Sequence, residues 1–321
     1  MSNILRHTRR TLLAFCLTLG ASFAAQAAYS DVYIFGDSLT DTGNVYAYSG
    51  GTNPPAPYYE GRFSNGPVWV EYLAAGLGHA QASTPSLTGG NNYSWGGAFS
   101  NQDGLAGPGT GLISQILGQW SGNADANALY VVNAGGNDLR HVDAFNNPTA
   151  TPYSDAATLL NNMLFSLNKL IDAGARHLLV SNIADLGLVP EAEGRRAEAT
   201  ALTVAYNDAL SAALVSLSAV RQVSIIELDI FGMLNEVVSD TQNGGAKYGF
   251  LDASIPCFYP LSPFSCDQSV FSDALHPSGR AHQILGLAAL DLVRANQIPE
   301  PASLALILGA LIAFGASRRR V

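Results

Sequence analysis

The stretch Asp31-Val-Tyr-Ile-Phe-Gly-Asp-Ser-Leu-Thr40 decides the fold class of this chain. Its first five residues form a short run rich in apolar and strand-forming side chains, and the run ends at Gly36, which is typical of a buried strand. Gly36 permits a tight turn directly after the strand. We expect this turn to present the Ser38 hydroxyl at the start of a helix, where free N–H groups favour developing negative charge.

Strand and helix patterns alternate along the rest of the chain. Short apolar runs predict strands, and apolar residues at helical spacing predict helices between them. Strands that are apolar on both faces and alternate with helices favour a parallel sheet covered on both sides. We therefore predict an α/β fold, a three-layer α/β/α sandwich with a mainly parallel sheet. The predicted strands are 31–35, 128–133, 177–183 and 223–228, and the predicted helices are 67–75, 155–173, 192–217 and 278–295.

Polar clusters follow two of these strands and precede the last helix. Gly36 to Leu39 follows the first strand, Gly135-Gly136-Asn137-Asp138 follows the second, and Asp273-Ala274-Leu275-His276 comes just before the helix. Functional groups of an open parallel sheet gather at the carboxyl ends of its strands, so we expect the three clusters to lie together. Each cluster alone also suits a turn, a loop or a surface pair, but their combination indicates a catalytic site.

In these motifs the chain resembles the GDSL or SGNH family of hydrolases. Gly36-Asp37-Ser38-Leu39 matches the name-giving motif letter for letter, and Thr40 to Asn44 strengthens the likeness to the lipase-like branch. The resemblance runs from residue 31 to 295 and implies the flavodoxin-like SGNH hydrolase fold. The other matching segments are Asn92 to Ala98, Gly135 to Asp138, Leu186 to Pro190 and Asp273 to Pro277.

The resemblance implies a Ser-Asp-His triad. A serine hydroxyl is a poor nucleophile and needs an adjacent base. His276 would take the proton of Ser38 and return it to the leaving alcohol, while Asp273 would orient the imidazole and stabilise its charged form. The resemblance implies neither a metal nor an organic cofactor.

The same resemblance implies an oxyanion hole with three donors. These are the backbone N–H groups of Ser38 and Gly97 and the side-chain amide of Asn137. Trp95 stands where the family has a smaller residue before the two glycines, so Gly96 remains the second choice for the glycine donor.

For other residues near these motifs, the sequence either predicts a structural role or leaves two roles open. Asp37 and Asp138 are expected to bond backbone N–H groups of their turns. An aromatic group in the loop after residue 57 suits either an acyl pocket or packing under the loop. Its members are Tyr58, Tyr59, Phe63, Trp69 and Tyr72.

The first 27 residues resemble a secretory signal peptide. Arginines 6, 9 and 10 precede the apolar run 11–24, and Ala25-Gln26-Ala27 has the small-x-small pattern of a cleavage site. An uncleaved anchor helix is the alternative. A lipid attached to Cys16 is disfavoured because the bulky Phe15 precedes it. We expect an exported protein whose hydrolase domain covers residues 28–298.

The last 23 residues, 299–321, resemble a PEP-CTERM sorting signal. Pro299-Glu300-Pro301 precedes the apolar run 302–316 and the basic end Arg318-Arg319-Arg320. Such a run reaches only about 22 Å as a helix, against a bilayer core of roughly 30 Å. The resemblance implies brief contact with the inner membrane, cleavage by sorting machinery and release outward. A permanent C-terminal anchor is the alternative.

Composition and charge exclude several classes of protein. Hydrophobic residues make up 48% of the chain and charged residues 13%, which is not a disordered composition. The ends hold six of the 16 basic residues and one of the 25 acidic ones, so the body has 10 basic and 24 acidic residues, a net charge of −14. That charge disfavours nucleic acid as a partner.

The body of the chain retains two cysteines, Cys257 and Cys266. An even pair in an exported protein predicts one disulfide. Two cysteines alone cannot make a structural zinc site.

The function that these features favour is hydrolysis of carboxylic esters, either acyl esters or lipids. A deacetylase of acetylated polysaccharide is the main competitor, because the C-terminal pattern suggests an exopolysaccharide setting. Acyl transfer to another alcohol uses the same intermediate. A surface interaction protein that keeps the fold without activity is disfavoured, because the set of serine, glycine, asparagine and histidine motifs is intact.

Overall fold

The computed structural model describes residues 29–120, 122–140 and 156–297. The chain divides into two compact units, residues 29–293 and the two ends together, 1–28 with 294–321. Of the second unit the structure describes only residues 294–297, the last turn of helix α9. The predicted signal peptide and the predicted sorting signal lie outside the described residues.

The first unit is built on a parallel sheet of four strands. In spatial order these are β1 (Val32–Gly36), β4 (Leu129–Asn133), β5 (His177–Ser181) and β6 (Ser224–Leu228). On the free side of β1, Ile34 pairs in parallel with Asn92, through bonds from Ile34 N–H to the Asn91 carbonyl and from Tyr93 N–H to the Ile34 carbonyl. This short partner gives the second-first-third-fourth-fifth order of a flavodoxin-like sheet.

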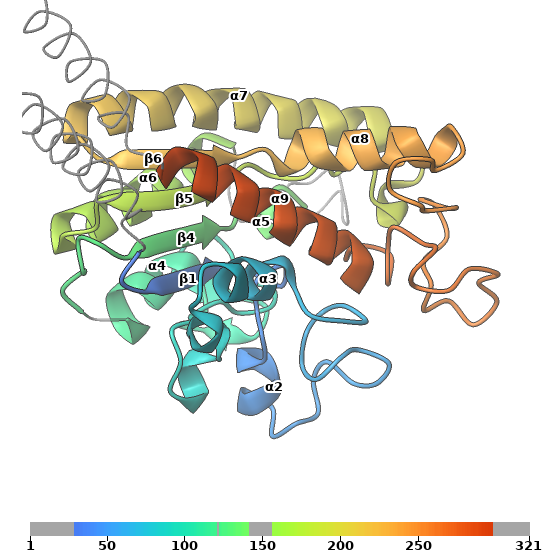
Figure 1. Cartoon of the computed structure of the whole chain (residues 1–321), viewed down its shortest axis with the longest axis horizontal. Helices are drawn as coiled ribbons and strands as arrows, with labels where there is room; N and C mark the ends of the chain where they lie inside the picture. Colours follow the sequence, from blue (N-terminus) through green and yellow to red (C-terminus); the bar gives the residue numbers. More distant parts are fainter. Residues whose placement is uncertain (1–28, 121, 141–155, 298–321) are drawn as a thin grey trace, which may run out of the picture. The chain divides into compact units, whose positions relative to one another are not determined.

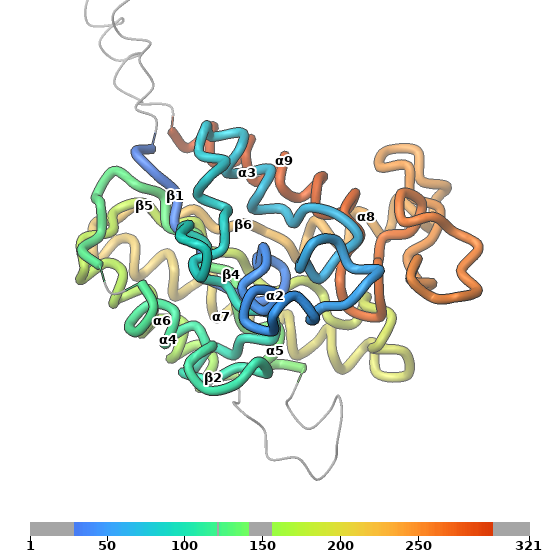
Figure 2. The backbone as a smooth tube through the Cα atoms, turned by 90° about the horizontal axis from the view of Figure 1, so that it is seen from below, coloured from blue at the N-terminus to red at the C-terminus, as the bar shows by residue number. Residues whose placement is uncertain are grey.

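Side chains of alternate strand residues enter two separate cores, which makes the fold three-layered. Phe35, Tyr130 and Val180 pack against α6 (Ala156–Ala173) and α7 (Arg196–Arg221). Ile34, Val131 and Leu179 pack on the opposite face against α3 (Trp69–Gly76) and α9 (Gly279–Gln297). Figures 1 and 2 show the strands between these two pairs of helices. The predicted α/β/α sandwich with a parallel sheet is confirmed.

Shorter elements complete the described chain. The remaining helices are α2 (Asn44–Tyr48), α4 (Leu112–Ser114), α5 (Gly136–Arg140) and α8 (Ile230–Gln242), with the helical turns η1 (Ala80–Ser83), η2 (Ser86–Thr88), η3 (Gln115–Gln119) and η4 (Pro190–Ala192). The strands β2 (Asp103–Gly104) and β3 (Gly107–Pro108) form a two-stranded antiparallel hairpin.

One local expectation is wrong. Ser38 does not begin a helix but lies in a hydrogen-bonded turn, in which the N–H groups of Thr40 and Asp41 both donate to the Asp37 carbonyl. Helix α2 begins only at Asn44, after Gly43 with a φ of 130°. The turn does not continue as a helix because the buried carboxylate of Asp41 takes up the N–H groups of residues 43 to 45.

Helix α7 is by length and composition apolar enough to cross a membrane. Four of its side chains, Ala199, Tyr206, Leu210 and Leu214, are buried in the core that covers the sheet. The helix therefore packs as one layer of the folded unit.

Candidate active site

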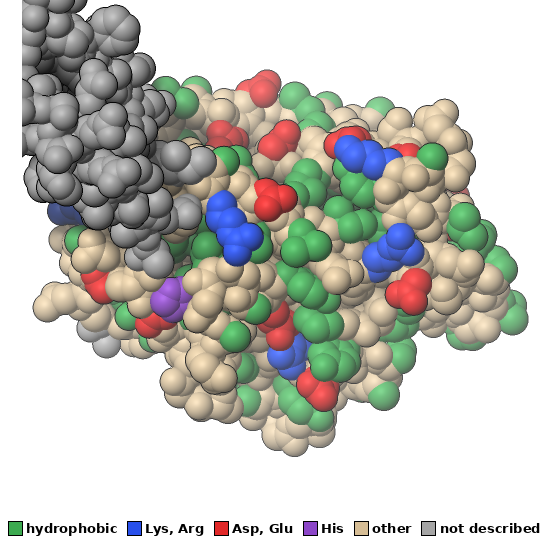
Figure 3. Space-filling view, viewed as in Figure 1, with side chains coloured by type: hydrophobic (Ala, Val, Ile, Leu, Met, Phe, Trp, Pro, Cys, Tyr) green, Lys and Arg blue, Asp and Glu red, His purple; other side chains and the backbone are tan. Residues whose placement is uncertain are grey.

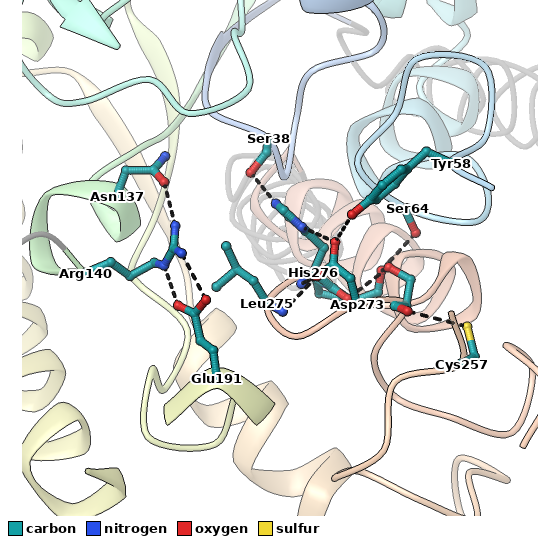
Figure 4. A network of polar contacts seen from close by, with 12 residues as sticks. Ser38, Tyr58, Ser64, Asn137, Arg140, Glu191, Cys257, Asp273, Leu275 and His276 are labelled. Carbon is teal, nitrogen blue, oxygen red and sulfur yellow. Dashed lines mark hydrogen bonds and ion pairs between the residues drawn. The ribbon is translucent and has the colours of Figure 1, made fainter. Parts of the chain in front are cut away.

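Ser38, His276 and Asp273 form a hydrogen-bonded row at the carboxyl end of β1 (Figure 4). His276 Nε2 lies 2.9 Å from Ser38 Oγ, and His276 Nδ1 lies 2.7 Å from Asp273 Oδ2. A carboxylate can only accept, so Nδ1 carries the ring hydrogen and Nε2 is left to accept the hydroxyl of Ser38. This is the arrangement that lets a histidine take a proton from serine.

The carboxylate of Asp273 is held by four donors. Its Oδ1 accepts from the N–H groups of Leu275 and His276, and its Oδ2 accepts from His276 Nδ1 and from the Tyr58 hydroxyl. Burial opposes ionisation, but the bonds from His276 and Tyr58 outweigh it and hold the pKa of this carboxyl well below its usual range. Asp273 is therefore ionised wherever the imidazole can act as a base.

Two buried acids shape the turn that carries Ser38. Asp37 Oδ1 accepts from Leu39 N–H at 3.0 Å, and Asp41 Oδ2 accepts from Gly96 N–H at 2.8 Å across the site. Burial raises the pKa of each carboxyl to about 6, although the backbone N–H groups that they bind lower it. Asp37 thus has the structural role expected of it, and Asp41 ties the serine turn to the Asn92–Ala98 segment.

The hydrogen bonds of their N–H groups distinguish Gly96 from Gly97 as the candidate oxyanion donor. The N–H of Gly96 is engaged by Asp41. Among the described residues, the N–H groups of Ser38 and Gly97 donate to no acceptor. Gly97 has a φ of 77°, and an added Cβ would lie 2.7 Å from the Cβ of Leu105, so the position suits glycine alone. Gly97 is therefore the glycine whose N–H is available.

Asn137 lies in α5, next to the same segment. Its Nδ2 donates to the Ala98 carbonyl at 3.0 Å, and its Oδ1 accepts from Arg140 at 3.3 Å. Arg140 in turn makes a two-pronged ion pair with Glu191, at 2.5 and 2.9 Å. The bond to Ala98, the residue after Gly97, holds the amide nitrogen beside the glycine segment, and Figure 4 shows the bond from Arg140 that fixes the other end of the amide. Asp138 has a structural role, but not within its own turn as expected: it accepts from the N–H and the hydroxyl of Ser100, 38 residues earlier.

Comparison with known proteins agrees with this geometry. The model of the GDSL-like lipase/acylhydrolase family matches residues 32–289. The chain belongs to this family.

Relatives of this GDSL-like chain cover most of its length. A phosphatidylcholine-sterol acyltransferase of Aeromonas hydrophila is 31% identical over 86% of this chain and 80% of its own. A GDSL esterase/lipase of Arabidopsis thaliana is 26% identical over 79% of this chain and 84% of its own. A solved structure of a lipolytic GDSL-family protein of Veillonella parvula covers 81% of this chain and 96% of its own, with 15% identity and a TM-score of 0.44.

A cavity of this GDSL-like site extends from Ser38 and His276 between α8 and α9. Its far walls are almost entirely aliphatic. They are formed by Ile183, Ala184, Leu186 and Val189 after β5, by Ile230, Met233, Leu234 and Val237 of α8, and by Ala281, Ile284 and Leu285 of α9. Asn137 and Arg140 lie at the polar end with the serine. The site can therefore place an apolar group beside the nucleophile.

The aromatic group of the loop does not line this cavity. Trp69 is fully buried in the core under α9. Tyr58 and Phe63 instead contact the candidate triad, Tyr58 through Asp273 and Phe63 through the His276 ring at 5.5 Å between centroids. Packing under the loop, rather than an acyl pocket, is the arrangement found.

The sequence analysis did not identify Gln115, or the pair of Arg140 and Glu191, as residues that support the candidate active site. Gln115 accepts from the N–H of Gly36 and donates to its carbonyl, both at 2.8 Å, and so fixes the strand end before the serine. The spacing of Arg140 three residues after Asn137 is the one local pattern that could have drawn attention to it. For Gln115, 79 residues from its partner, the sequence offers no such pattern.

The predicted disulfide is present in the structure, between Cys257 and Cys266. In the described ranges, no group of three or more His, Cys, Asp or Glu side chains is placed to hold a metal ion. On the face drawn in Figure 3, lysine and arginine side chains lie apart from one another, with acidic side chains among them.

Proposed function

We propose that this protein is an exported serine hydrolase of fatty acyl esters. Ser38 Oγ attacks the ester carbonyl while His276 Nε2 takes its proton. The imidazolium, stabilised by Asp273, then gives that proton to the leaving alcohol, and the acyl group stays on Ser38. Water attacks the acyl-enzyme with His276 again as base, which releases the acid and restores the serine.

The tetrahedral oxyanion binds to the N–H groups of Ser38 and Gly97 and to the Asn137 amide in this proposal. The engaged N–H of Gly96 and the unengaged N–H groups of Ser38 and Gly97 support this set. Donors already aimed at the position of the developing charge lower the barrier because they need no reorganisation during the reaction.

The observation that carries the choice of substrate is the aliphatic cavity beside Ser38. Burial of each methylene of a chain is worth about 0.8 kcal/mol. A site with such walls gains from a chain of several carbons and gains little from an acetyl group. We therefore favour acyl lipids over acetylated polysaccharide, which remains the competing substrate.

Acyl transfer is a second candidate for the same site. The 31% identical relative named phosphatidylcholine-sterol acyltransferase supports it. Transfer differs from hydrolysis only in the acceptor that attacks the acyl-enzyme, an alcohol in place of water.

The proposal is tested with nitrophenyl esters of increasing chain length, beside acetylated xylan. We expect kcat/KM to rise from acetyl to medium chains, and Ser38→Ala to lose turnover while keeping its circular dichroism spectrum. Highest activity on acetylated sugar would favour the deacetylase, and an alcohol acceptor such as cholesterol, added to the assay, would reveal transfer as acyl ester product. Wild-type turnover in Ser38→Ala would remove Ser38 as nucleophile.

Export is part of the proposal and rests on the ends of the sequence. Residues 1–27 have the pattern of a secretory signal peptide, and residues 299–321 have that of a sorting signal that contacts the inner membrane before release. The net charge of the body, −14 after the ends are removed, suits a partner other than nucleic acid.

A further inference from the structure

Tyr58 lies in the loop between α2 and α3, far in sequence from the triad motifs. Its hydroxyl donates to Asp273 Oδ2 at 2.5 Å, as Figure 4 shows. Its ring stands edge-on between Phe258, at 5.1 Å between centroids, and Phe63, at 6.2 Å. Two rings from different segments thus fix the direction in which the hydroxyl points.

The oxygen that Tyr58 binds is the one that His276 uses. Oδ2 accepts from His276 Nδ1 at 2.7 Å as well as from Tyr58, whereas Oδ1 is occupied by the N–H groups of residues 275 and 276. A second donor on an oxygen draws away part of the charge available to the first. The strength of the Asp273–His276 bond therefore depends on Tyr58.

We propose that Tyr58 is a positioning residue of this active site, which fixes Asp273 and moderates the charge that the carboxylate presents to His276. The inference rests on the proposed function and adds a fourth group to the row of Ser38, His276 and Asp273. Tyr58 does not line the cavity, so it acts through Asp273 and not on the substrate.

The loop that carries Tyr58 also forms hydrogen bonds with the backbone directly after His276. Ser64 Oγ donates to the Pro277 carbonyl at 2.8 Å, and Asn65 Oδ1 accepts from Gly279 N–H at 2.8 Å. These bonds keep the loop against the triad segment independently of the tyrosine hydroxyl. Removing that hydroxyl alone therefore leaves the loop attached.

The hydroxyl remains a donor at every working pH, because burial, and then the bond to Asp273, raise the pKa of Tyr58. The other ionisable groups near His276 are Asp37 on the serine turn and His282 on α9, with Arg140 of α5 acting on Asp37. These groups are unchanged by substitution of Tyr58. A change in the titration of the site after that substitution thus reports the bond to Oδ2.

The test compares Tyr58→Phe with Tyr59→Phe, an exposed neighbour whose ring lies beneath the Arg62 guanidinium. We expect Tyr58→Phe to lower kcat about tenfold with KM unchanged, because a carboxylate that has lost one hydrogen bond no longer fixes the orientation of the His276 imidazole, even though it presents more charge to it. The acid limb of the kcat/KM profile should move up by roughly half a pH unit, because a carboxylate relieved of one donor stabilises the imidazolium more. Tyr59→Phe should match the wild type in all three.

A second readout needs no substrate. In proton NMR of the free enzyme, the low-field resonance of His276 Nδ1–H should move further downfield in Tyr58→Phe, because its bond to Oδ2 becomes stronger. Failure to find any ester substrate would overturn the proposed function but leave this shift. An unchanged resonance and acid limb would overturn the role of Tyr58, as would a raised KM with unchanged kcat, which would indicate substrate contact.

Discussion

At the scale of single residues, Asn137 offers a direct test of the oxyanion hole. We expect Asn137→Ala to lower kcat by about 10²–10³, the usual cost of one lost donor. Stability should fall by about 1–3 kcal/mol at most, because the buried Ala98 carbonyl loses the donor from Asn137, whereas Arg140 keeps its ion pair with Glu191. Steady-state kinetics together with urea unfolding would separate the two effects, and an unchanged rate would remove Asn137 from the site.

His282 predicts how the stability of the fold depends on pH. The side chain is 1% exposed, and its Nδ1 accepts from the Trp69 N–H at 3.3 Å. Burial, with a smaller contribution from His276, lowers its pKa from 6.5 to about 3. Between these values the unfolded chain binds a proton that the folded chain does not, so the stability present above pH 6.5 is lost as the pH falls.

We therefore expect His282→Gln, which can still accept from Trp69, to lose less stability on acidification than the wild type. The difference should reach about 2 kcal/mol between pH 6.5 and pH 5, at roughly 1.4 kcal/mol for each pH unit. Asp37 and Asp41 act in the opposite sense, because their raised pKa values favour the folded state as the pH falls. They are common to both proteins and cancel in the comparison. Parallel pH dependences from urea unfolding would contradict the prediction.

The residues that sequence could identify are those whose motif is local. Ser38 follows Gly36-Asp37 and His276 follows Asp273 by three positions, so each carries its context with it. Tyr58 meets Asp273 across 215 residues. Packing of two loops creates that contact, and a loop tyrosine has no neighbours in sequence that mark its role.

At the scale of helices and strands, the regular spacing of apolar residues was a better guide to the elements than amino-acid composition was. The predicted helix 155–173 matches α6 within one residue, because its apolar side chains repeat on one face. Helix α8, which walls the cavity, had no counterpart in the sequence analysis. Its apolar residues 230, 233, 234, 237 and 238 stand at helical spacing, so the sequence did carry the pattern that indicates this helix. Helix α7 begins at Arg196 rather than 192, because η4 and the turn at Gly194, with a φ of 87°, come first.

The Cys257–Cys266 disulfide braces the segment that leads to the triad. The backbone N–H groups of Cys257 and Phe258 donate to the carbonyls of Phe271 and Ser272, directly before Asp273. Replacing both cysteines by serine should lower the free energy of unfolding by about 2–3 kcal/mol, the chain-entropy value for a loop of about ten residues. Unfolding by urea would measure it, with intact mass before and after reduction as the control. Finding two free thiols in the exported wild-type protein would contradict the prediction that this disulfide braces the segment.

At the scale of the whole molecule, the candidate catalytic residues and the predicted sorting signal occupy separate parts of the chain. Ser38, Asn137, Asp273 and His276 all belong to the unit of residues 29–293. Fold class followed from the alternation of strands and helices over that whole unit. The sheet order followed only from the family resemblance, because the partner of β1 at Asn92 is a single bridge that no strand pattern marks. The fate of the C-terminus is a matter for experiment on the native protein.

We predict that the mature protein lacks the apolar run 302–316 and the arginines 318–320. Pro-Glu-Pro precedes a run shorter than the roughly 20 residues of a permanent anchor, and the basic cluster would stay on the cytoplasmic side. Mass spectrometry of the C-terminal peptide from the native organism, with membrane and medium separated, should find the processed form outside the cell with ester hydrolysis intact. Replacing residues 299–301 by alanine should retain the chain in the membrane, whereas replacing Gln297, two residues before this motif, should not. An intact arginine end found in the membrane fraction alone would instead establish a permanent anchor.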